Sequence, residues 1–472
     1  MNKKEIIKHY EDIALEVEKW KKKNSYYHSE ISRYHRFHIQ EGSSILEIGC
    51  ENGDLLASLK PRRGLGIDAS EGMIKAAKKK YGRRKNLQFR VTDLESFKTK
   101  EKFEYVIISG TLGRISDVQL FLKRVSTFCT PDSRIMINHY NHHWSFVLRL
   151  GEKLRLKMPE KVKNWLSVGN IENFLYVTGY EVLKKDSFLL VPKKIPLISP
   201  LINKTIAKFP LLRRLCVSNI ITARPLRPPD NATNLTASVV ITCRDEKESI
   251  EGLVKRTPNM GKHTEIIFVE GHSKDGTPEE IKRMMKKYPN KDIKLLTQDG
   301  IGQGDAFRKG YDRANGDFVL WLEADLTTPP EELAKFWDVF ISGRGEYVNG
   351  TRMVYGMDKN AMPRLNFIGN RGFGKLFTWL LGQRFTDTLC GLKAISKRNY
   401  IKIRKEIEFF GDFDPFGDFE LIFGVAKNNL KVTEVPVKYV PRQYGETKTK
   451  PFKHGLLLIR MSFIAFRKFK LF

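Results

Sequence analysis

Short apolar runs rich in β-branched and aromatic residues recur along the chain, separated by turn residues and charged helical patterns. In the second half they predict buried strands at 237–242, 265–269 and 317–322. The third run leads into Glu323-Ala-Asp325. Residues two apart on a strand project from the same face. We therefore expect Glu323 and Asp325 together at the C-terminal end of a strand, where open α/β sheets bind ligands.

The first half shows the same alternation. Its first predicted strand runs into the glycine turn Gly49-Cys-Glu-Asn-Gly53 and an apolar helix. A strand, glycine turn and helix open a βαβ unit that can present backbone N–H groups to a ligand. Asp68 ends the second strand and Asp93 follows the third. The predicted strands are 44–48, 64–67, 87–91 and 105–109.

The apolar pattern stops and restarts around a stretch punctuated by Pro, Asn and Asp. We expect a first domain over residues 1–224, a linker over 225–236 and a second domain over 237–450. The last residues, 451–472, are apolar with spaced Arg and Lys, and they are too interrupted to span a bilayer. They predict a basic amphipathic helix that either lies on an anionic membrane surface or packs on the second domain. Residues 190–222 are also apolar and basic together, and they either cover a core or lie on a membrane.

The charge balance limits the class of partner. The chain has 83 Lys and Arg against 54 Asp and Glu, a formal net charge of +29, which favours anionic partners. Without zinc-finger spacing or an aromatic RNA-binding signature, nucleic acid is not the expected partner. The five cysteines are widely spaced without a CxxC, as in reduced cytoplasmic proteins. With no apolar signal core, we expect a cytoplasmic protein, peripheral on the cytoplasmic face of the membrane.

The pair Glu323 and Asp325 carries the clearest chemistry. Adjacent carboxylates repel each other unless a cation lies between them. A hard divalent ion, Mg²⁺ or Mn²⁺, held by these oxygens and by a substrate diphosphate, would suit the pair. The alternative is two solvated carboxylates at a strand end. Upstream, Gly302 to Gly310 forms a glycine-rich turn running into an Arg/Lys helix.

The ordered series Glu47-Ile-Gly-Cys, Asp68 and Asp93 resembles class I S-adenosylmethionine-dependent methyltransferases over roughly residues 40–190. The resemblance implies a Rossmann-like fold in which the glycine turn approaches the methionine part of the cofactor. It further implies that Asp68 holds the ribose and that Asp93 lies against the adenine. The family usually has Gly where this chain has Glu51, so a retained fold without catalysis stays open. The implied S-adenosylmethionine-binding residues are Glu47, Gly49, Gly53, Asp68 and Asp93.

The stretch 300–332 resembles the nucleotide-sugar half of a family 2 glycosyltransferase. Upstream, Asp245-Glu246 and the segment Glu270 to Thr277 fall where that family has its first two loops. The resemblance implies a type-A glycosyltransferase fold and a GDP- or UDP-hexose donor. Because Glu270-Gly271 replaces the family's double Asp, the nucleobase cannot be carried over. The implied donor-binding residues are Asp245, Glu246, Glu270, Ser273, Asp275, Gly304, Asp305 and Glu323, with Glu323 and Asp325 holding the metal.

Later motifs resemble the dolichyl- and polyprenyl-phosphate hexosyltransferase branch of that family. They are Gly350-Thr-Arg352, Asn370-Arg371, the segment 386–391 and the segment 442–448. The implied acceptor is a polyprenyl phosphate or another anion, placed by Arg352 and Arg371, while Arg442 and Lys448 close over the diphosphate. A lipid phosphate is already anionic and needs no strong general base. The implied catalytic residues are Asp325, Arg352, Arg371, Arg442 and Lys448.

The chain is therefore expected to be a two-domain α/β protein, with an N-terminal Rossmann-like methyltransferase fold and a C-terminal type-A glycosyltransferase fold. The expected function is metal-dependent transfer of a hexose to a phosphorylated acceptor, fused to a methyltransferase. The alternative is a membrane-surface scaffold, with a degenerate methyltransferase domain and a glycosyltransferase acting on a non-lipid glycan acceptor.

Overall fold

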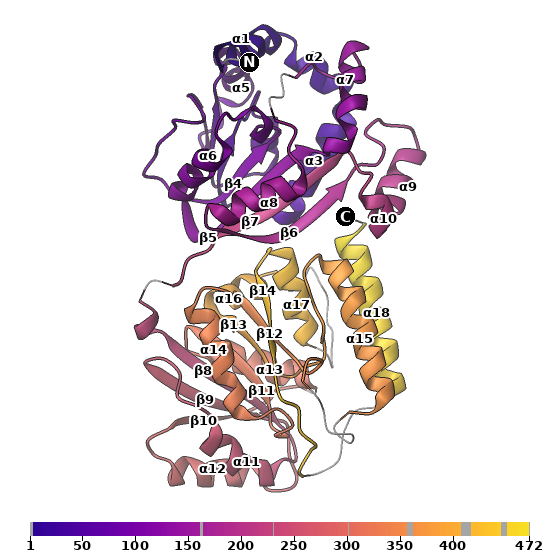
Figure 1. The fold of residues 1–472 in the computed structure, drawn as a ribbon. Helices are drawn as coiled ribbons and strands as arrows, with labels where there is room; N and C mark the ends of the chain where they lie inside the picture. Colours follow the sequence, from indigo (N-terminus) through magenta and orange to yellow (C-terminus); the bar gives the residue numbers. More distant parts are fainter. Residues whose placement is uncertain are drawn as a thin grey trace. The chain divides into compact units, whose positions relative to one another are not determined.

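A computed structural model describes residues 3–160, 164–229, 231–300, 302–355, 362–406, 417–444 and 451–471. The chain forms two compact units, Met1–Leu226 with Lys470–Phe472, and Arg227–Phe469. Each has a seven-stranded sheet flanked by helices (Figure 1). The predicted fold class, two α/β domains, is confirmed.

The sheet of the first unit has the order β3-β2-β1-β4-β5-β7-β6. All its strands are parallel except β7, which runs antiparallel to β5 and β6. The strands are β1 (Ser44–Ile48), β2 (Arg63–Asp68), β3 (Leu87–Val91), β4 (Phe103–Ser109), β5 (Cys129–Tyr140), β6 (Tyr180–Phe188) and β7 (Ser218–Pro225).

Helices cover both faces of this sheet because its strands are apolar on both faces. Successive residues of β1 point into different cores: Ile45 packs with α3, α4 and α5, and Leu46 packs with α6 and α8. The helices are α1 (Lys3–Ala14), α2 (Val17–Lys23), α3 (Ser25–His38), α4 (Asp54–Ser58), α5 (Glu71–Tyr81), α6 (Val118–Val125), α7 (Ser145–Lys153), α8 (Val168–Val177), α9 (Ile198–Lys204) and α10 (Pro210–Arg213).

The second unit has the strand order β10-β9-β8-β11-β13-β12-β14, with β13 antiparallel to its neighbours. The three runs predicted from the sequence are confirmed as β8, β9 and β11. The strands are β8 (Thr236–Cys243), β9 (His263–Glu270), β10 (Asp292–Thr297), β11 (Phe318–Glu323), β12 (Tyr347–Thr351), β13 (Lys393–Ser396) and β14 (Val432–Pro436).

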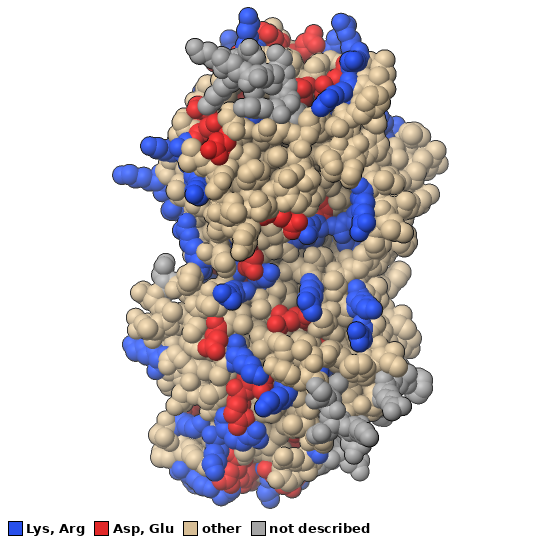
Figure 2. Space-filling view, in the orientation of Figure 1, with Lys and Arg blue, Asp and Glu red and all other residues tan. Residues whose placement is uncertain are grey.

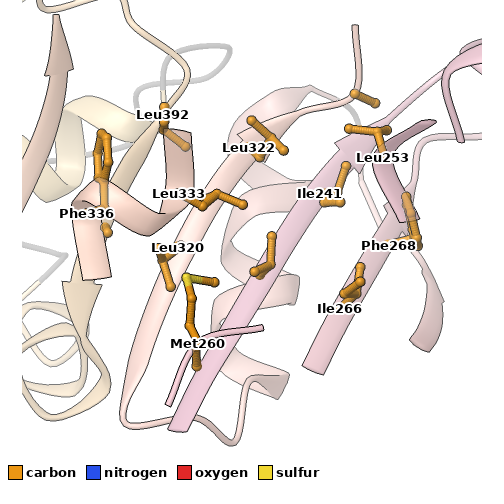
Figure 3. Packing of buried hydrophobic residues seen from close by; sticks show 14 of the residues in the cluster. Ile241, Leu253, Met260, Ile266, Phe268, Leu320, Leu322, Leu333, Phe336 and Leu392 are labelled. Atoms are coloured by element: carbon orange, nitrogen blue, oxygen red, sulfur yellow. The ribbon is translucent and has the colours of Figure 1, made fainter. Parts of the chain in front are cut away.

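The sheet of the second unit packs against helices on both of its faces. Ile241, Leu320 and Leu322 share one face of the sheet with Phe268, next to Phe336 of α14 (Figure 3). Val240, on the opposite face of β8, packs against Gly310 of α13. The helices are α11 (Lys247–Arg256), α12 (Thr277–Lys287), α13 (Gln303–Arg313), α14 (Leu333–Ile341), α15 (Arg364–Leu381), α16 (Lys397–Arg404), α17 (Asp418–Lys427) and α18 (Pro451–Phe469).

The last helix has two different faces. Leu458 and Met461 of α18 are buried, and its Phe466 ring lies 6.0 Å from the ring of Trp379 on α15. Leu456 and Phe463 are exposed. Helix α18 thus packs on the second unit and also presents apolar side chains outward, and binding to a membrane surface stays a prediction. Among the described residues, no helix is long and apolar enough to cross a membrane.

The basic side chains do not gather in one place on the face shown in Figure 2. Lys and Arg are spread over each unit, with Asp and Glu between them. On this face the distribution of charge alone therefore does not mark a binding site.

Candidate functional site

The predicted acid pair lies at the end of β11. Glu323 Oε1 accepts a hydrogen bond from Gln303 Nε2 at 2.8 Å, and Asp325 Oδ1 accepts one from Thr327 Oγ1 at 2.8 Å. Burial, and then the charge of Asp325, raise the pKa of Glu323 to about 7. A cofactor cation beside these two carboxylates would offset the repulsion between their negative charges.

The Glu323 side chain lies directly against Gly391, in the loop before β13. A Cβ added at Gly391 would lie 2.3 Å from Cδ of Glu323, closer than any real Cβ contact. Gly391 therefore permits the position of the carboxylate. Sequence reasoning included Gly391 in a motif but gave it no role, and it did not identify Gln303 as a partner of Glu323.

Arg442 joins two acidic loops. Its guanidinium donates to Glu246, and its Nη1 lies 3.7 Å from Asp325 Oδ2. Its Nε donates to the Tyr444 carbonyl at 2.6 Å. The structure thus brings together Glu246, Asp325 and Arg442, which lie far apart in the sequence. Lys448 is outside the described residues.

Four of the eight predicted donor-binding residues hold the loops after β8 and β9 together. Ser273 Oγ accepts from the Asp245 N–H at 2.9 Å, and Asp245 Oδ1 accepts from the Lys274 N–H at 2.8 Å. Asp275 Oδ2 accepts from the Lys247 N–H at 3.0 Å, and Glu270 accepts from the Ser273 N–H. These side chains shape the rim of the site through backbone contacts.

The predicted pair Gly304 and Asp305 lies in the first turn of α13. Gly304 is buried. Asp305 Oδ2 accepts from the backbone N–H groups of Gly300 at 2.8 Å and Asp299 at 3.1 Å. Asp305 therefore orders the loop that leads into the helix carrying Gln303.

Arg352 is fixed by a buried carboxylate. Its Nε and Nη2 donate to the two oxygens of Asp387 at 2.7 and 2.9 Å, and Asn370 donates to Asp387 at 2.6 Å. Asp387 is fully buried. Sequence reasoning gave no role to Asp387, although the Asp-x-x-x-Gly spacing of its motif was a usable signal. Arg371 lies exposed on α15, with no ion pair to another described residue.

In the first unit the glycine turn has the conformation that glycine allows. Gly49 and Gly53 both have φ of +77°. A Cβ at Gly49 would lie 2.1 Å from Oγ1 of Thr111, and a Cβ at Gly53 would lie 2.6 Å from the ring of Phe89. These two positions therefore exclude side chains both by backbone conformation and by packing.

Asp68 holds this turn against β2. Its two carboxylate oxygens accept from the backbone N–H groups of Glu51 and Ser70, each at 3.0 Å. Burial raises the pKa of Asp68, and both hydrogen bonds oppose that rise. Asp93 accepts from the Glu95 N–H at 3.1 Å in the turn after β3.

Glu51 is neutralised by a lysine from α2. Its backbone has φ of +48°, and its carboxylate lies 3.1 Å from Nζ of Lys21. Burial alone would raise the pKa of Glu51, but Lys21 and then Arg114 outweigh it and hold that pKa at about 2. Sequence reasoning missed Lys21, because nothing in the N-terminal pattern links it to the turn.

A cavity of about 850 Å³ lies beside the turn. Its walls come from the ends of β1, β4 and β5 and from α2, α3 and α7. Of the predicted cofactor residues, Glu47 and Gly49 line it, whereas Gly53, Asp68 and Asp93 do not. Burial raises the pKa of Glu47 to about 8. The cavity also holds His139, whose two ring nitrogens are buried without a hydrogen-bond partner among the described residues.

Comparison with protein families finds two matches. Residues 238–403 match the model described as glycosyl transferase family 2, and residues 39–183 match a methyltransferase domain. The first match covers the acid pair and its neighbouring loops. The second covers the glycine turn and the three acids Glu47, Asp68 and Asp93.

Several curated proteins are similar to the second unit. Glycosyltransferase AglJ of Haloferax volcanii is 29% identical over 213 residues, which are 45% of this chain and 65% of that protein. The dolichyl-phosphate hexose transferase of the same organism is 31% identical over 191 residues, 40% of this chain and 76% of that protein. The dolichol-phosphate mannosyltransferase of Pyrococcus furiosus is 28% identical over 219 residues, which are 46% of this chain and 60% of that protein. The chain thus spans somewhat less than two thirds of the length of most of these relatives.

The first unit is similar to a solved structure described as a SAM-dependent methyltransferase, possibly a histamine N-methyltransferase, from Thermotoga maritima. That protein is 14% identical, with a TM-score of 0.36, and the match covers 46% of this chain and 99% of the other. A likeness this low says nothing of the reaction.

Proposed function

From the premise that this chain belongs to glycosyl transferase family 2 and carries a methyltransferase domain, we propose that its second unit moves a hexose from a nucleotide sugar to a polyprenyl phosphate. The observation that carries the proposal is the convergence of Glu323, Asp325 and Arg442 at the end of β11. The relatives named for transfer to dolichyl phosphate support the class of acceptor.

The reaction leaves a nucleoside diphosphate that must carry new negative charge. A divalent cation, Mg²⁺ or Mn²⁺, on Glu323 and Asp325 would supply Lewis-acid stabilisation of that charge. The raised pKa of Glu323, caused by burial and by Asp325, supports a cation at this place. Among the described residues, no group of three His, Cys, Asp or Glu has the geometry of a metal site. Substrate phosphate oxygens would therefore complete the coordination.

Arg442 is suited to the same diphosphate. In this structure its guanidinium lies against Glu246 and Asp325. When the diphosphate binds, the guanidinium can exchange a carboxylate for phosphate oxygens, which Arg binds in a bidentate manner. Lys448 is proposed to act with it.

The two arginines proposed to bind the acceptor differ in how firmly their side chains are held. Arg352 is anchored to Asp387 through two nitrogens, so we infer that it holds a guanidinium in a fixed position beside the site, with its charge balanced by Asp387. Arg371 is exposed on α15 and is the better candidate for direct contact with a lipid phosphate. The phosphate is already ionised, so positioning and charge are what these residues would supply.

Release of nucleoside diphosphate tests the proposal. Wild-type protein is incubated with UDP- and GDP-hexoses and polyprenyl phosphate, with Mg²⁺ or with EDTA. Asp325→Asn and EDTA should each lower the rate by at least about 100-fold, since they remove charge stabilisation of the transition state. Asp338→Asn, an exposed acid on α14, serves as the matched control. Full activity in EDTA would overturn the metal role of Glu323 and Asp325.

For the first unit we propose binding of S-adenosylmethionine, which when bound supplies an activated methyl group. Two observations support the fit: Asp68 is held against the turn by two N–H groups, and Lys21 neutralises the Glu51 carboxylate. Glu47, Gly49, Gly53, Asp68 and Asp93 are the proposed binding residues.

Calorimetric titration of the full chain with S-adenosylhomocysteine tests this second activity. Wild type should bind, and Asp68→Ala should abolish binding. If wild type shows no heat of binding and Glu51→Gly restores binding, the cofactor site has been lost at position 51. If neither S-adenosylhomocysteine binding nor diphosphate release is seen in any variant, the alternative of a membrane-surface scaffold is favoured. If diphosphate is released only with a glycan acceptor, the lipid phosphate is excluded as the acceptor.

A further inference from the structure

The first unit contains a segment, 192–215, in which apolar side chains point to solvent. It comprises α9, α10 and their connections. Leu197 is 87% exposed, Leu211 is 79% exposed and Leu201 is 61% exposed. Leucines are usually buried in a soluble domain, and a cluster of them at the surface marks an interaction site.

The inside of the segment is polar. Asn203, only 3% exposed, donates to the Val191 carbonyl at 2.8 Å and accepts from the Val191 N–H at 3.0 Å. Ser199 is fully buried and donates to the Lys193 carbonyl at 2.6 Å. These hydrogen bonds fix the backbone while the leucines remain outside. The segment therefore buries Ser199 and Asn203 beside Ala207 and exposes leucines, which is the reverse of the usual burial pattern.

Helix α7 extends this surface. Phe146 is 77% exposed and Leu154 is 60% exposed. Trp144, directly before α7, donates from Nε1 to the Leu215 carbonyl at 2.8 Å, and Asn141 donates to the Arg214 carbonyl at 2.9 Å. These contacts join α7 to the end of the segment. We call the exposed apolar side chains of α7 and of residues 192–215 the α7–α10 surface.

The charge of the segment is one-sided. Residues 187–229 contain no Asp or Glu. Of the six Lys and Arg in residues 192–215, Lys194, Lys204 and Arg214 are exposed, whereas Arg213 pairs with Asp186 at 2.8 Å. Apolar side chains interleaved with cations fit the boundary between the headgroups and acyl chains of an anionic bilayer. A protein partner of ordinary surface composition would not require this complete absence of acids.

The surface also borders the cavity of the first unit. Val147, Leu156 and Lys193 line the cavity, and Val147 is 50% and Leu156 48% exposed. The wall of the cavity is therefore continuous with the exposed apolar side chains. A molecule held in a bilayer at this surface would lie next to the cavity.

We propose that the first unit binds an anionic lipid bilayer through the α7–α10 surface, independently of α18. This membrane contact is separate from the glycosyl transfer proposed above, since it concerns the other unit and needs no turnover. Its leucines enter the interfacial region while the exposed Lys194, Lys204 and Arg214 remain at the headgroups.

A fluorescent label at the surface tests the proposal in the full chain. The five native cysteines are all buried, so a new exposed cysteine can be labelled selectively with nitrobenzoxadiazole. Leu211→Cys is the test position, and Leu15→Cys, 94% exposed on the same unit, is the matched control. Both are made in a background carrying Leu456→Gln, Ile459→Gln and Phe463→Gln, which removes the exposed apolar face of α18.

Vesicles of phosphatidylglycerol and phosphatidylcholine are then added at low salt. The label at position 211 should shift to the blue and brighten at least about two-fold, the label at position 15 should not change, and 0.5 M salt should weaken the response. No response at 211, or an equal response at 15, overturns the proposal. A label at 211 that is already blue-shifted in buffer also overturns it, because protein would then cover the surface. Circular dichroism confirms folding, and Leu201→Cys provides a second test position.

Discussion

Lys21 and Glu51 form a partly buried ion pair at a turn where the resembled family usually has Gly in place of Glu51. The Glu51 carboxylate lies 3.1 Å from Lys21 Nζ, and burial makes each charge depend on the other. Removing one partner of a buried pair leaves an uncompensated charge, and this usually costs more than the pair contributes. The loss of one partner should therefore destabilise the first unit by more than the intact pair stabilises it.

Lys21→Met should lower the free energy of unfolding by roughly 1–3 kcal/mol, since Glu51 would remain charged and only partly exposed at the cavity wall. Denaturant titration at pH 7 measures the loss. Lys22→Met, an exposed neighbour on α2, is the control. The double variant Lys21→Met/Glu51→Gln should recover most of the stability. Equal stability of Lys21→Met and wild type would show that the pair lies in solvent.

Gly391 tests the position of Glu323 without changing its chemistry. Ala at position 391 would force the Glu323 carboxylate away, because the added Cβ lies 2.3 Å from its Cδ. Gly391→Ala should lower Mg²⁺-dependent diphosphate release by roughly ten-fold or more through misplaced charge stabilisation. Gly369→Ala on α15, where a Cβ meets nothing within 4 Å, should leave it unchanged. A fully active Gly391→Ala would mean that Glu323 is not needed in its observed position.

Helix α18 shows how one element can serve a core and a surface. Its buried Leu458 and Met461 face the protein, while Leu456, Ile459 and Phe463 are 69%, 59% and 66% exposed. Deleting 451–472 would also expose the buried side of the contact with α15. Substitution of the outer face is therefore the cleaner experiment.

Leu456→Gln/Ile459→Gln/Phe463→Gln should weaken sedimentation of the full chain with phosphatidylglycerol vesicles at least about three-fold, because apolar area and basic charge act together at a bilayer. Thermal unfolding should stay near wild type, since these side chains are exposed. Unchanged sedimentation of this variant, with loss only in Leu197→Gln/Leu211→Gln, would assign the binding to the first unit alone.

At the scale of the whole molecule, buried histidines set the acid limit of the first unit. Burial lowers the pKa of His28, His35 and His139 to about 4 each. An unfolded histidine titrates near 6.5. As pH falls from 6.5 to 4, the unfolded state takes up protons that the folded state does not, so stability falls with pH in this window. Glu47, whose pKa burial raises from 4.5 to about 8, acts in the opposite direction. Between these two pH values its folded carboxyl holds a proton that the unfolded one has lost, so stability falls as pH rises.

His139→Gln isolates one of these contributions, because its ring nitrogens have no hydrogen bonds to lose. From pH 7 to pH 5, wild type should lose up to about 2 kcal/mol more than the variant. The difference should become constant below about pH 4, where both states of wild type are protonated. Chemical denaturation of the first unit in the full chain at four pH values measures it. Parallel curves for the two proteins would refute the role of His139.

Much of the fold could be predicted, because alternation and turn residues act over a few positions. The strands around Glu323-Ala-Asp325 and the glycine turn at Gly49 are where the patterns placed them. The strand-end rule also places Glu323 and Asp325 on one edge of the sheet without knowledge of any neighbour.

The sequence by itself determined the two α/β units, the strands β1 to β4, β8, β9 and β11 and the acids at their ends, since each depends on local periodicity. Only the tertiary structure decided which side chains meet. Lys21 reaches Glu51 across 30 positions, Arg442 reaches Glu246 across 196, and Asp387 fixes Arg352. Such contacts are set by how helices and loops pack, and no spacing along the chain encodes them. The outward leucines of the α7–α10 surface likewise depend on buried Asn and Ser partners that only the folded chain supplies.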